Sequence, residues 1–561
     1  MPTARHLRLL SLALLLPALL AGPALASPAG DARDAAKEQR WQDAADGWMQ
    51  VLEKNEANRE AALGLAKAVI EGDLLDLQVP SSDALLAVLE KKEDDRDARL
   101  ALGNLFISTA LSKADQQAMK FIFEDAKQQF SMLIEARPTD EDAAVGLART
   151  HYWMAFFSDG LQVIDDFMAQ NKSKGPALYW KGQIFYRQAL DAYAAAGKMD
   201  DTAKELFQKA RGSYEAAAAA APKDLDAWMQ LGYACQYVGA TEDAQEAYEK
   251  VMVLDRESHM PLKGIASLYH YRPDEYRPAL EALAKKYDQN NAVYFFIGFD
   301  QYSKKEFDAA IESLGKYVER TKTPGAAWHY LGRALDGAGR EDEAKEAYVK
   351  ALKENPADEA SAGQIDAKLQ QAHAGSAGAS LSNAKAAIAA YKELFELAPT
   401  ASSPRNNAAF ILREAFARHQ NDQSWMPVLD ECIRLYTESS DLIEKKIDGR
   451  AEAFDDATLW NYAGVINDTG LMYQYYPARE DLEKAEEYYI RALELTGDGY
   501  ADAFGNLVKV YQKQGRLQEA YELARDCAES LRHADGTPHP ARRLAQQVRD
   551  QLASSGKVEA D

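Results

Sequence analysis

The densest group of metal-ligand side chains in this 561-residue sequence consists of His533 and His539, with Asp535 between them. A protein metal site needs three or four such ligands held in fixed geometry, whereas this group lies in a proline-containing tail without a helical pattern. The segment AGSAGAS at 374–380 has the wrong spacing for a G-x-S-x-G nucleophile elbow. The sequence also contains no glycine-rich phosphate loop of the Walker or dinucleotide-binding form. We therefore expect no metal and no cofactor.

Adjacent carboxylates are common, for example at Asp94–Asp95, Glu341–Asp342 and Asp455–Asp456. Most such pairs precede or open a predicted helix, where negative charge complements the helix dipole. An acid/base pair of the glycosidase type depends on proximity in the folded chain, which spacing does not reveal, and nothing in the sequence singles out one pair. We predict a protein that is not an enzyme, and an enzyme is the least favoured of three functional classes.

The first 26 residues have the pattern of a secretory signal peptide. Arg5 and Arg8 give a basic start, residues 9–20 form an apolar run, and Ala24 and Ala26 provide a small-residue cleavage site. A membrane anchor is the alternative, but the run is shorter than the roughly 20 residues that span a bilayer. We predict cleavage after Ala26, export to the periplasm or outside the cell, and a mature chain without an integral membrane segment.

The formal net charge is −23. Nucleic acid is therefore not an expected partner, because phosphate binding needs a concentrated basic surface, and anionic membrane surfaces are disfavoured for the same reason. The three cysteines, Cys235, Cys432 and Cys527, are sparse and far apart, so the sequence encodes no disulfide framework. We interpret all three as small core residues.

The clearest helical pattern runs from Ala326 to Pro356, where two apolar stripes at helical spacing flank a turn. The first stripe is formed by Trp328, Leu331, Gly332 and Leu335, and the second by Ala344, Tyr348 and Ala351. Small residues let two paired helices approach closely, while large rings fill the space between neighbouring pairs. With its closing proline, this stretch resembles the tetratricopeptide repeat, a helix–turn–helix unit of about 34 residues.

The same register returns at 141–174, 225–258, 259–290 and 291–324, and with insertions or departures through most of 35–535. A register that is kept across adjacent units is far more specific than a single match. The resemblance implies an all-α fold, a right-handed superhelical solenoid of tetratricopeptide helix–turn–helix repeats.

The array breaks at the Ala-, Gly- and Ser-rich segment 359–384, where the apolar periodicity is lost. The predicted organisation is a signal peptide at 1–26, a short linker at 27–34, an N-terminal repeat block at 35–358, a joint at 359–384, a C-terminal repeat block at 385–535, and a capping helix and tail at 536–561. Within the C-terminal block, Trp460 and Gly464 are expected to open a unit whose second helix carries Tyr489.

In tetratricopeptide arrays the first helices of successive units line a concave face. The family uses the second, fifth, ninth, twelfth and thirteenth positions of each first helix to hold an extended peptide or a partner helix. Carried over residue by residue, the resemblance implies a groove lined by Arg149, Tyr152, Trp153, Tyr179, Tyr186, Arg187, Met229, Tyr233, Tyr237, Met260, Tyr271, Phe295, Phe299, Tyr302, His329 and Arg333. Contiguous exposed apolar residues usually mark a binding surface. The alternative is that curvature or an inserted helix buries these side chains against each other.

These observations favour an exported, non-enzymatic scaffold that binds a protein or peptide partner in its groove for assembly of an envelope complex. A second hypothesis is a periplasmic scaffold of exopolysaccharide export or modification, as in some exported members of the family, whose groove aromatics contact the glycan. The sequence leaves the choice between these ligands open, together with the oligomeric state.

Overall fold

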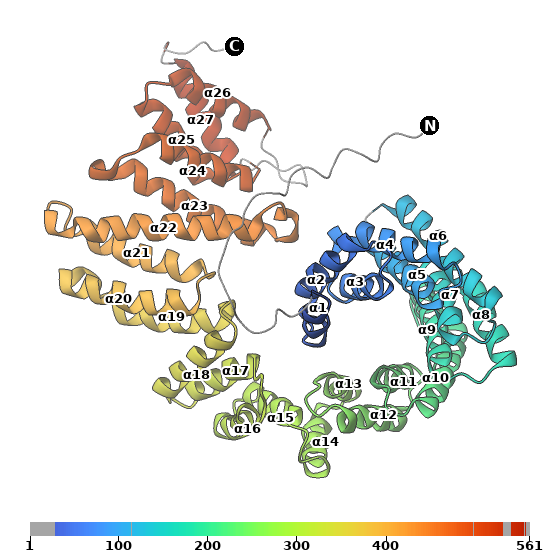
Figure 1. Cartoon of the computed structure of the whole chain (residues 1–561). Coiled ribbons are helices and arrows are strands. Elements are labelled where there is room, and N and C mark those ends of the chain that lie inside the picture. The colour runs from blue at the N-terminus through green and yellow to red at the C-terminus, as the bar shows by residue number, and fades with distance from the viewer. Residues whose placement is uncertain (1–27, 114, 498, 531–539, 555, 557–561) are drawn as a thin grey trace, which may run out of the picture. The chain divides into compact units, whose positions relative to one another are not determined.

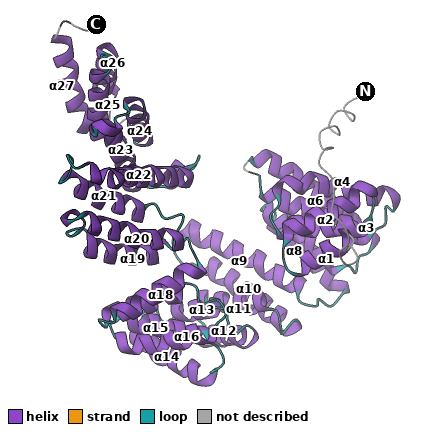
Figure 2. Ribbon diagram, turned by 60° about the vertical axis from the view of Figure 1, so that its left-hand side comes forward, coloured by secondary structure: helices purple, strands orange, loops and turns teal. Residues whose placement is uncertain are grey.

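The computed structural model describes residues 28–113, 115–497, 499–530, 540–554 and 556. Within these residues the chain forms 27 α-helices and no strand (Figure 1, Figure 2), which confirms the prediction of an all-α fold. The predicted signal peptide and the group around His533 lie outside the described residues. The contacts divide the chain into two compact units, unit 1 from Met1 to Tyr276 and unit 2 from Arg277 to Asp561.

Unit 1 is built from successive helices that pack in pairs. They are α1 (Pro28–Lys37), α2 (Trp41–Lys54), α3 (Arg59–Glu71), α4 (Gln78–Lys91), α5 (Arg96–Leu111), α6 (Gln116–Ala136), α7 (Glu141–Trp153), α8 (Phe157–Gln170), α9 (Pro176–Ala196), α10 (Asp201–Ala220), α11 (Leu225–Tyr237), α12 (Thr241–Leu254) and α13 (Met260–Leu268). The first helices of the pairs, among them α3, α5, α7, α9 and α11, follow the inner side of the curve of unit 1, and the second helices follow its outer side (Figure 1).

Unit 2 continues the same pairing after α14 (Pro273–Lys286), which contains the boundary between the units. Its helices are α15 (Ala292–Ser303), α16 (Phe307–Arg320), α17 (Ala326–Gly337), α18 (Glu341–Glu354), α19 (Glu359–His373), α20 (Leu381–Leu397), α21 (Ser403–Ala417), α22 (Met426–Ile447), α23 (Asp456–Tyr475), α24 (Leu482–Leu495), α25 (Ala501–Lys513), α26 (Leu517–Ser530) and α27 (Pro540–Ser554). Five short 3-10 turns accompany the helices of the described residues. None of the helices in the described part of the chain combines the length and the apolarity that a membrane crossing requires.

A left-handed residue ends the first helix of many pairs and turns the chain into the second. Gly239 and Gly339 hold this position with φ of 76°, a conformation that glycine adopts without steric cost. In other units the same turn is made by Ala155 (φ 60°) and Lys305 (φ 63°), although a side chain is disfavoured there. The turn geometry is therefore common to the repeats even where its glycine is missing.

A buried ring wedged between glycines joins successive pairs. Phe130 on α6 is fully buried, and a Cβ added at Gly103 on α5 or at Gly146 on α7 would lie 2.6 Å or 2.3 Å from its ring atoms. Tyr248 on α12 lies in the same way between Gly232 on α11 and Gly264 on α13. Only glycine leaves room for such a contact, so the predicted association of a small residue with a large ring is how the pairs stack.

Ion pairs between arginines and carboxylates connect successive first helices of unit 1. Arg96 at the start of α5 binds Asp140 (Nε to Oδ2, 2.6 Å) and Asp142 (Nη2 to Oδ2, 2.5 Å) at the start of α7. Arg59 on α3 binds Asp95 and Asp97 at the start of α5 in the same manner. Asp95 and Asp140 also cap their own helices, because each accepts a hydrogen bond from the backbone N–H three residues later.

The segments at which the sequence analysis divides the chain are also helical. Residues 359–384, the predicted joint, form α19, the 3-10 turn Ala377–Ala379 and the start of α20, and Asp366 of α19 accepts hydrogen bonds from Tyr391 and Asn407. Most of the predicted linker lies in α1. In the last helix, α27, Ala545 and Leu552 are buried and the helix packs against α26 and α25. The division into two blocks at 359–384 stays a prediction.

Candidate partner-binding surface

Five predicted groove residues of unit 1 belong to one continuous line of aromatic rings, which we call the ring chain. In order of contact its members are Trp153, Tyr152, Trp180, Tyr179, Tyr214, Tyr186, Tyr237 and Phe207. The centroids of neighbouring rings lie between 4.2 and 6.4 Å apart. The chain crosses α7, α9, α10 and α11, so it follows three successive first helices. Trp180, Tyr214 and Phe207 are the members that the groove positions did not include.

The two predicted positions nearest the ends of the ring chain are open to solvent, whereas its middle is not. Trp153 is 41% exposed and Tyr237 is 38% exposed. Between them, Tyr179 and Tyr186 are half-buried, and burial raises the pKa of Tyr179 to about 12 and also raises that of Tyr186. The Tyr179 hydroxyl accepts a hydrogen bond from Gln183 (2.7 Å). The rings therefore stabilise each other in the middle and offer apolar area at Trp153 and Tyr237.

Most contacts within the ring chain are edge-to-face. Tyr152 meets Trp153 at an interplanar angle of 83° and Trp180 at 74°, and Tyr186 meets Tyr237 at 80°. Such contacts are a preferred geometry for aromatic pairs, but each covers part of a ring face. Tyr237 is in addition stacked on Phe207 at 4.2 Å. The face of Tyr237 that stacks on Phe207 is therefore covered and cannot stack on a ligand.

The other predicted positions of unit 1 are not members of the ring chain, although Arg149 and Arg187 lie beside its Trp180 and Tyr152 rings. Arg187 is exposed and binds Asp191 (3.0 Å) on its own helix. Tyr233 is half-buried and packs on Tyr248. Met229 is only 8% exposed and belongs to the core, whereas Met260, the first residue of α13, is 48% exposed. Tyr271, just after α13, is almost fully exposed beside His270.

The predicted positions of unit 2 form a separate aromatic group on α15 and α17. Phe295, Phe299 and Tyr302 each approach the Tyr330 ring, at 6.0, 5.0 and 6.1 Å. The guanidinium of Arg333 lies 5.7 Å from the Tyr302 ring. His329 Nδ1 lies 3.0 Å from Ser361 Oγ, and burial lowers the pKa of His329. Tyr330, around which the group is organised, was not among the predicted residues.

A pocket of about 610 Å³ lies on α3, α5 and α7. Arg149 is the one lining residue that the sequence predicted to be part of the groove. We call this cavity the Arg149 pocket. Its lining is Leu63, Ala66, Lys67, Ile70, Glu71, Asp97, Leu100, Ala101, Asn104, Ile107, Ser108, Leu111 and Arg149. The sequence held a signal for it, because Leu63, Lys67 and Ile70 on α3 have the same spacing as Leu100, Asn104 and Ile107 on α5. The family's groove positions were assigned to this sequence only from residue 141 onward, so no residue of α3 or α5 was predicted to line the groove.

Arg149 lies where the Arg149 pocket meets the ring chain. Its guanidinium is 5.4 Å from the ring centroid of Trp180, and its Nη1 donates to Asn104 Oδ1 (3.2 Å). Its Nε is buried and has no hydrogen-bond partner among the described residues. Burial lowers the pKa of this arginine, because the charged form loses water without gaining an opposite charge. The pocket thus contains a cation whose charge the fold does not balance.

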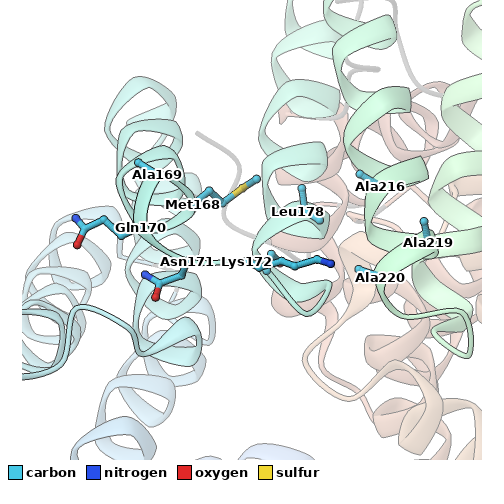
Figure 3. A pocket seen from close by; sticks show the side chains of 10 residues that line it. Met168, Ala169, Gln170, Asn171, Lys172, Leu178, Ala216, Ala219 and Ala220 are labelled. Atoms are coloured by element: carbon cyan, nitrogen blue, oxygen red, sulfur yellow. The ribbon is translucent and has the colours of Figure 1, made fainter.

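Two further pockets of unit 1 adjoin the loop after α8. The first, of about 710 Å³, lies between α8 and α10 over Leu178 of α9, and the Lys172 side chain extends toward Ala220 (Figure 3). Ser173 in its wall already donates to Glu141, and Asn171 donates to the carbonyl of Phe167. The second, of about 790 Å³, holds the ion-paired Arg96 and Asp140. Apart from Lys172, the polar groups named here are engaged within the fold, so we place no site in these pockets.

Metal and thiol chemistry receive no support from the described residues. No group of three or more His, Cys, Asp or Glu side chains among them could hold a metal ion. Cys235, Cys432 and Cys527 are buried. Burial raises the pKa of Cys235 to about 11 and raises that of Cys432 as well, and a raised thiol pKa makes a cysteine unreactive.

Comparison with known proteins gives matches to repeats and to repeat proteins. Models of the tetratricopeptide repeat match residues 225–258 and 325–358, and no curated protein sequence matches the chain. A thermophilic tetratricopeptide-repeat protein of Thermus thermophilus is 15% identical and aligns over 37% of this chain and 97% of its own, with a TM-score of 0.29. Yeast Tom70 is 15% identical over 94% of this chain and 96% of its own (TM-score 0.23). A tetratricopeptide-repeat protein of Parabacteroides merdae is 12% identical over 49% and 98% (TM-score 0.27). These superpositions are too loose to transfer a binding site.

The two matched repeats are α11–α12 and α17–α18. In each, a buried tyrosine packs on the glycine of the first helix, Tyr248 on Gly232 and Tyr348 on Gly332. The same contact recurs outside the matched segments, at Phe130 with Gly103 and at Tyr214 with Gly182. The matched repeats and the shared packing of the units around them make this chain a tetratricopeptide-repeat protein.

Proposed function

We propose that this chain is an exported, non-enzymatic adaptor, and that unit 1 holds an extended segment of a protein partner along α7, α9 and α11 for assembly of an envelope complex. Proteins built of these repeats are generally non-catalytic scaffolds that bind protein partners. The observation that carries the proposal is the ring chain, which has large apolar side chains open to solvent at Trp153 and Tyr237. These are the last residues of α7 and α11, two helices that follow the inner side of unit 1 (Figure 1). Aromatic side chains of this kind concentrate binding energy at protein interfaces.

Photo-crosslinking from the inner face tests the partner. With benzoylphenylalanine in place of Trp153 or Tyr237 in the full chain, expressed in its native host, we expect a discrete protein adduct. The same replacement at Phe121, which is 66% exposed on the outer helix α6, serves as the control and should give none. When the crosslinked segment is used as a peptide, Trp153→Ala should weaken its binding at least about tenfold, since truncating an aromatic hot spot costs about 2 kcal/mol or more. Equal adducts from all three positions, or adducts with glycan alone, would refute the proposal.

Export is tested separately, through the mature N-terminus. If residues 1–26 are a signal peptide, the protein recovered from its native host should begin at Ser27, and a chain that lacks residues 2–26 should stay in the cytoplasm. Mass spectrometry of the intact protein and cell fractionation measure both results. Recovery of a chain that retains residues 1–26 in the cytoplasm would contradict this part of the proposal.

A further inference from the structure

Arg149 has fewer partners than the other arginines along the first helices of unit 1. Arg59, Arg96 and Arg187 each bind a carboxylate at 3.0 Å or less. Around Arg149, no carboxylate of the described residues lies within ion-pair distance, and its side chain is bonded only to the amide oxygen of Asn104. Arg99 on α5 also lacks a carboxylate partner in the described part of the chain, but it donates to Gln129 Oε1 (3.0 Å) and to the carbonyl of Glu93 (2.7 Å). Guanidinium groups have five N–H donors, so most of the hydrogen-bonding capacity of Arg149 is unused in this structure.

Arg149 is half-buried, with its Nε fully buried, and a partly desolvated cation without an ion-pair partner lowers the stability of the fold that holds it. The Trp180 face compensates part of the charge, because a cation near an aromatic ring is attracted to it, but neither the ring nor Asn104 is an anion. Residues that reduce the stability of the free protein are a mark of functional sites. The missing counter-charge therefore belongs to whatever enters the Arg149 pocket.

The rest of the pocket restricts what can enter. Leu63, Ile70, Leu100 and Ile107 make its walls largely aliphatic, and Lys67 is a second cation. Glu71 and Asp97 also line it, and their negative charges disfavour a polyanion such as nucleic acid. Asp97 is already ion-paired with Arg59 and Arg96, so Lys67, Arg149 and Glu71 leave the pocket one net positive charge. A single carboxylate beside an aliphatic side chain would neutralise that charge and match the aliphatic walls.

We propose that the Arg149 pocket receives an internal Asp or Glu side chain of the protein partner, with an adjacent aliphatic residue against α3 and α5. This inference rests on the proposed function and names the chemistry of the partner segment. The acidic residue is internal rather than chain-terminal, because Arg149 also contacts Trp180 of the ring chain. A segment that fills the pocket and also reaches Trp153 must continue on both sides of the residue that binds Arg149.

A peptide selection on the full chain tests this inference. The probe is a displayed library of random dodecapeptides inserted as an internal loop of a carrier domain, so that no peptide has a free terminus. Sequences that bind the wild type should be enriched in Asp or Glu within about three residues of Leu, Ile or Val. Panning against Arg149→Gln should abolish this enrichment. Panning against Arg211→Gln, which removes an arginine of the second helix α10 that is paired with Asp243 (2.6 Å), should leave it unchanged.

Affinities of one selected peptide then separate the pocket from the ring chain. Changing the acidic residue of this peptide to its amide should weaken binding to the wild-type protein at least tenfold. The same peptide change should not further weaken binding to the Arg149→Gln protein. Peptides that lose binding with Trp153→Ala but bind Arg149→Gln as well as the wild type would overturn the pocket inference and leave the proposed function standing. Failure to enrich any peptide would count against both.

The stability of the free protein supplies a second readout. Arg149→Met removes the unbalanced charge and keeps most of the side-chain volume, so we expect the melting temperature of the unliganded chain to rise by a few degrees while peptide binding is lost. A fall in melting temperature would show that Arg149 supports the fold and would overturn the inference.

Discussion

Replacing Phe130 by alanine is expected to destabilise unit 1 by about 3–5 kcal/mol, which is the usual cost of truncating a fully buried phenylalanine. The ring is fully buried and fits between Gly103 and Gly146, which have no side chains with which to refill the space. The effect is local, because each repeat contacts only its neighbours. Urea unfolding should show the loss, and amide hydrogen exchange should place it in α5, α6 and α7.

Phe121→Ala is the matched control, since it makes the same substitution on the same helix at a ring that is largely exposed. It should change stability by no more than about 0.5 kcal/mol. If the two variants were equally stable, the ring between the glycines would not be what joins α5 and α6 to α7.

The second large effect is expected from Arg96→Ala. The substitution leaves the buried carboxylate of Asp140 without its cation, and an uncompensated buried charge of this kind costs about 3–5 kcal/mol. Arg96 is 27% exposed, so water screens part of the interaction and we expect about 2 kcal/mol. Arg187→Ala is the control, because both Arg187 and its partner Asp191 are about half exposed, and it should cost less than about 0.5 kcal/mol. Denaturant unfolding at pH 7 measures both variants.

The pH dependence of this difference follows from Asp140. The hydrogen bond from Arg96 holds the pKa of Asp140 below its ordinary value, which is about 3.9 in an unfolded chain. Near pH 4 the unfolded state therefore binds more protons than the folded state, so the stabilisation is complete above about pH 5 and is lost as the pH falls through the folded pKa. The stability gap between wild type and Arg96→Ala should narrow below about pH 4. A gap that stays constant down to pH 2 would contradict the ion-pair explanation.

The sequence is sufficient to predict the helix pairs, because their packing depends on residue size at fixed spacing. The stripe of Trp328, Leu331 and Gly332 lies on α17 as expected, and Tyr348 packs on Gly332. In α23 the register was wrong, since Tyr489 packs on Gly470 and not on Gly464. The helix is 20 residues long and carries both glycines, and spacing alone does not tell which of them faces the ring.

The candidate site is less predictable, because exposure depends on what covers a position as well as on its place in the repeat. Met229 and Met260 are both methionines that the repeat register assigns to the groove, yet one is buried and the other is open to solvent. In the same way, the unbalanced charge of Arg149 is a property of its surroundings. No spacing rule shows that Asn104, rather than a carboxylate, lies opposite to it.

The ring between two glycines also limits how this protein can evolve. Phe130 fits against a glycine in its own repeat and another in the next, and Tyr248 does the same with Gly232 and Gly264. A copy of either of these two repeats therefore carries a ring that requires a glycine in the repeat that follows it. Each of the two can be duplicated or exchanged only together with its successor, whereas Tyr348 contacts a glycine of its own repeat alone and sets no such condition.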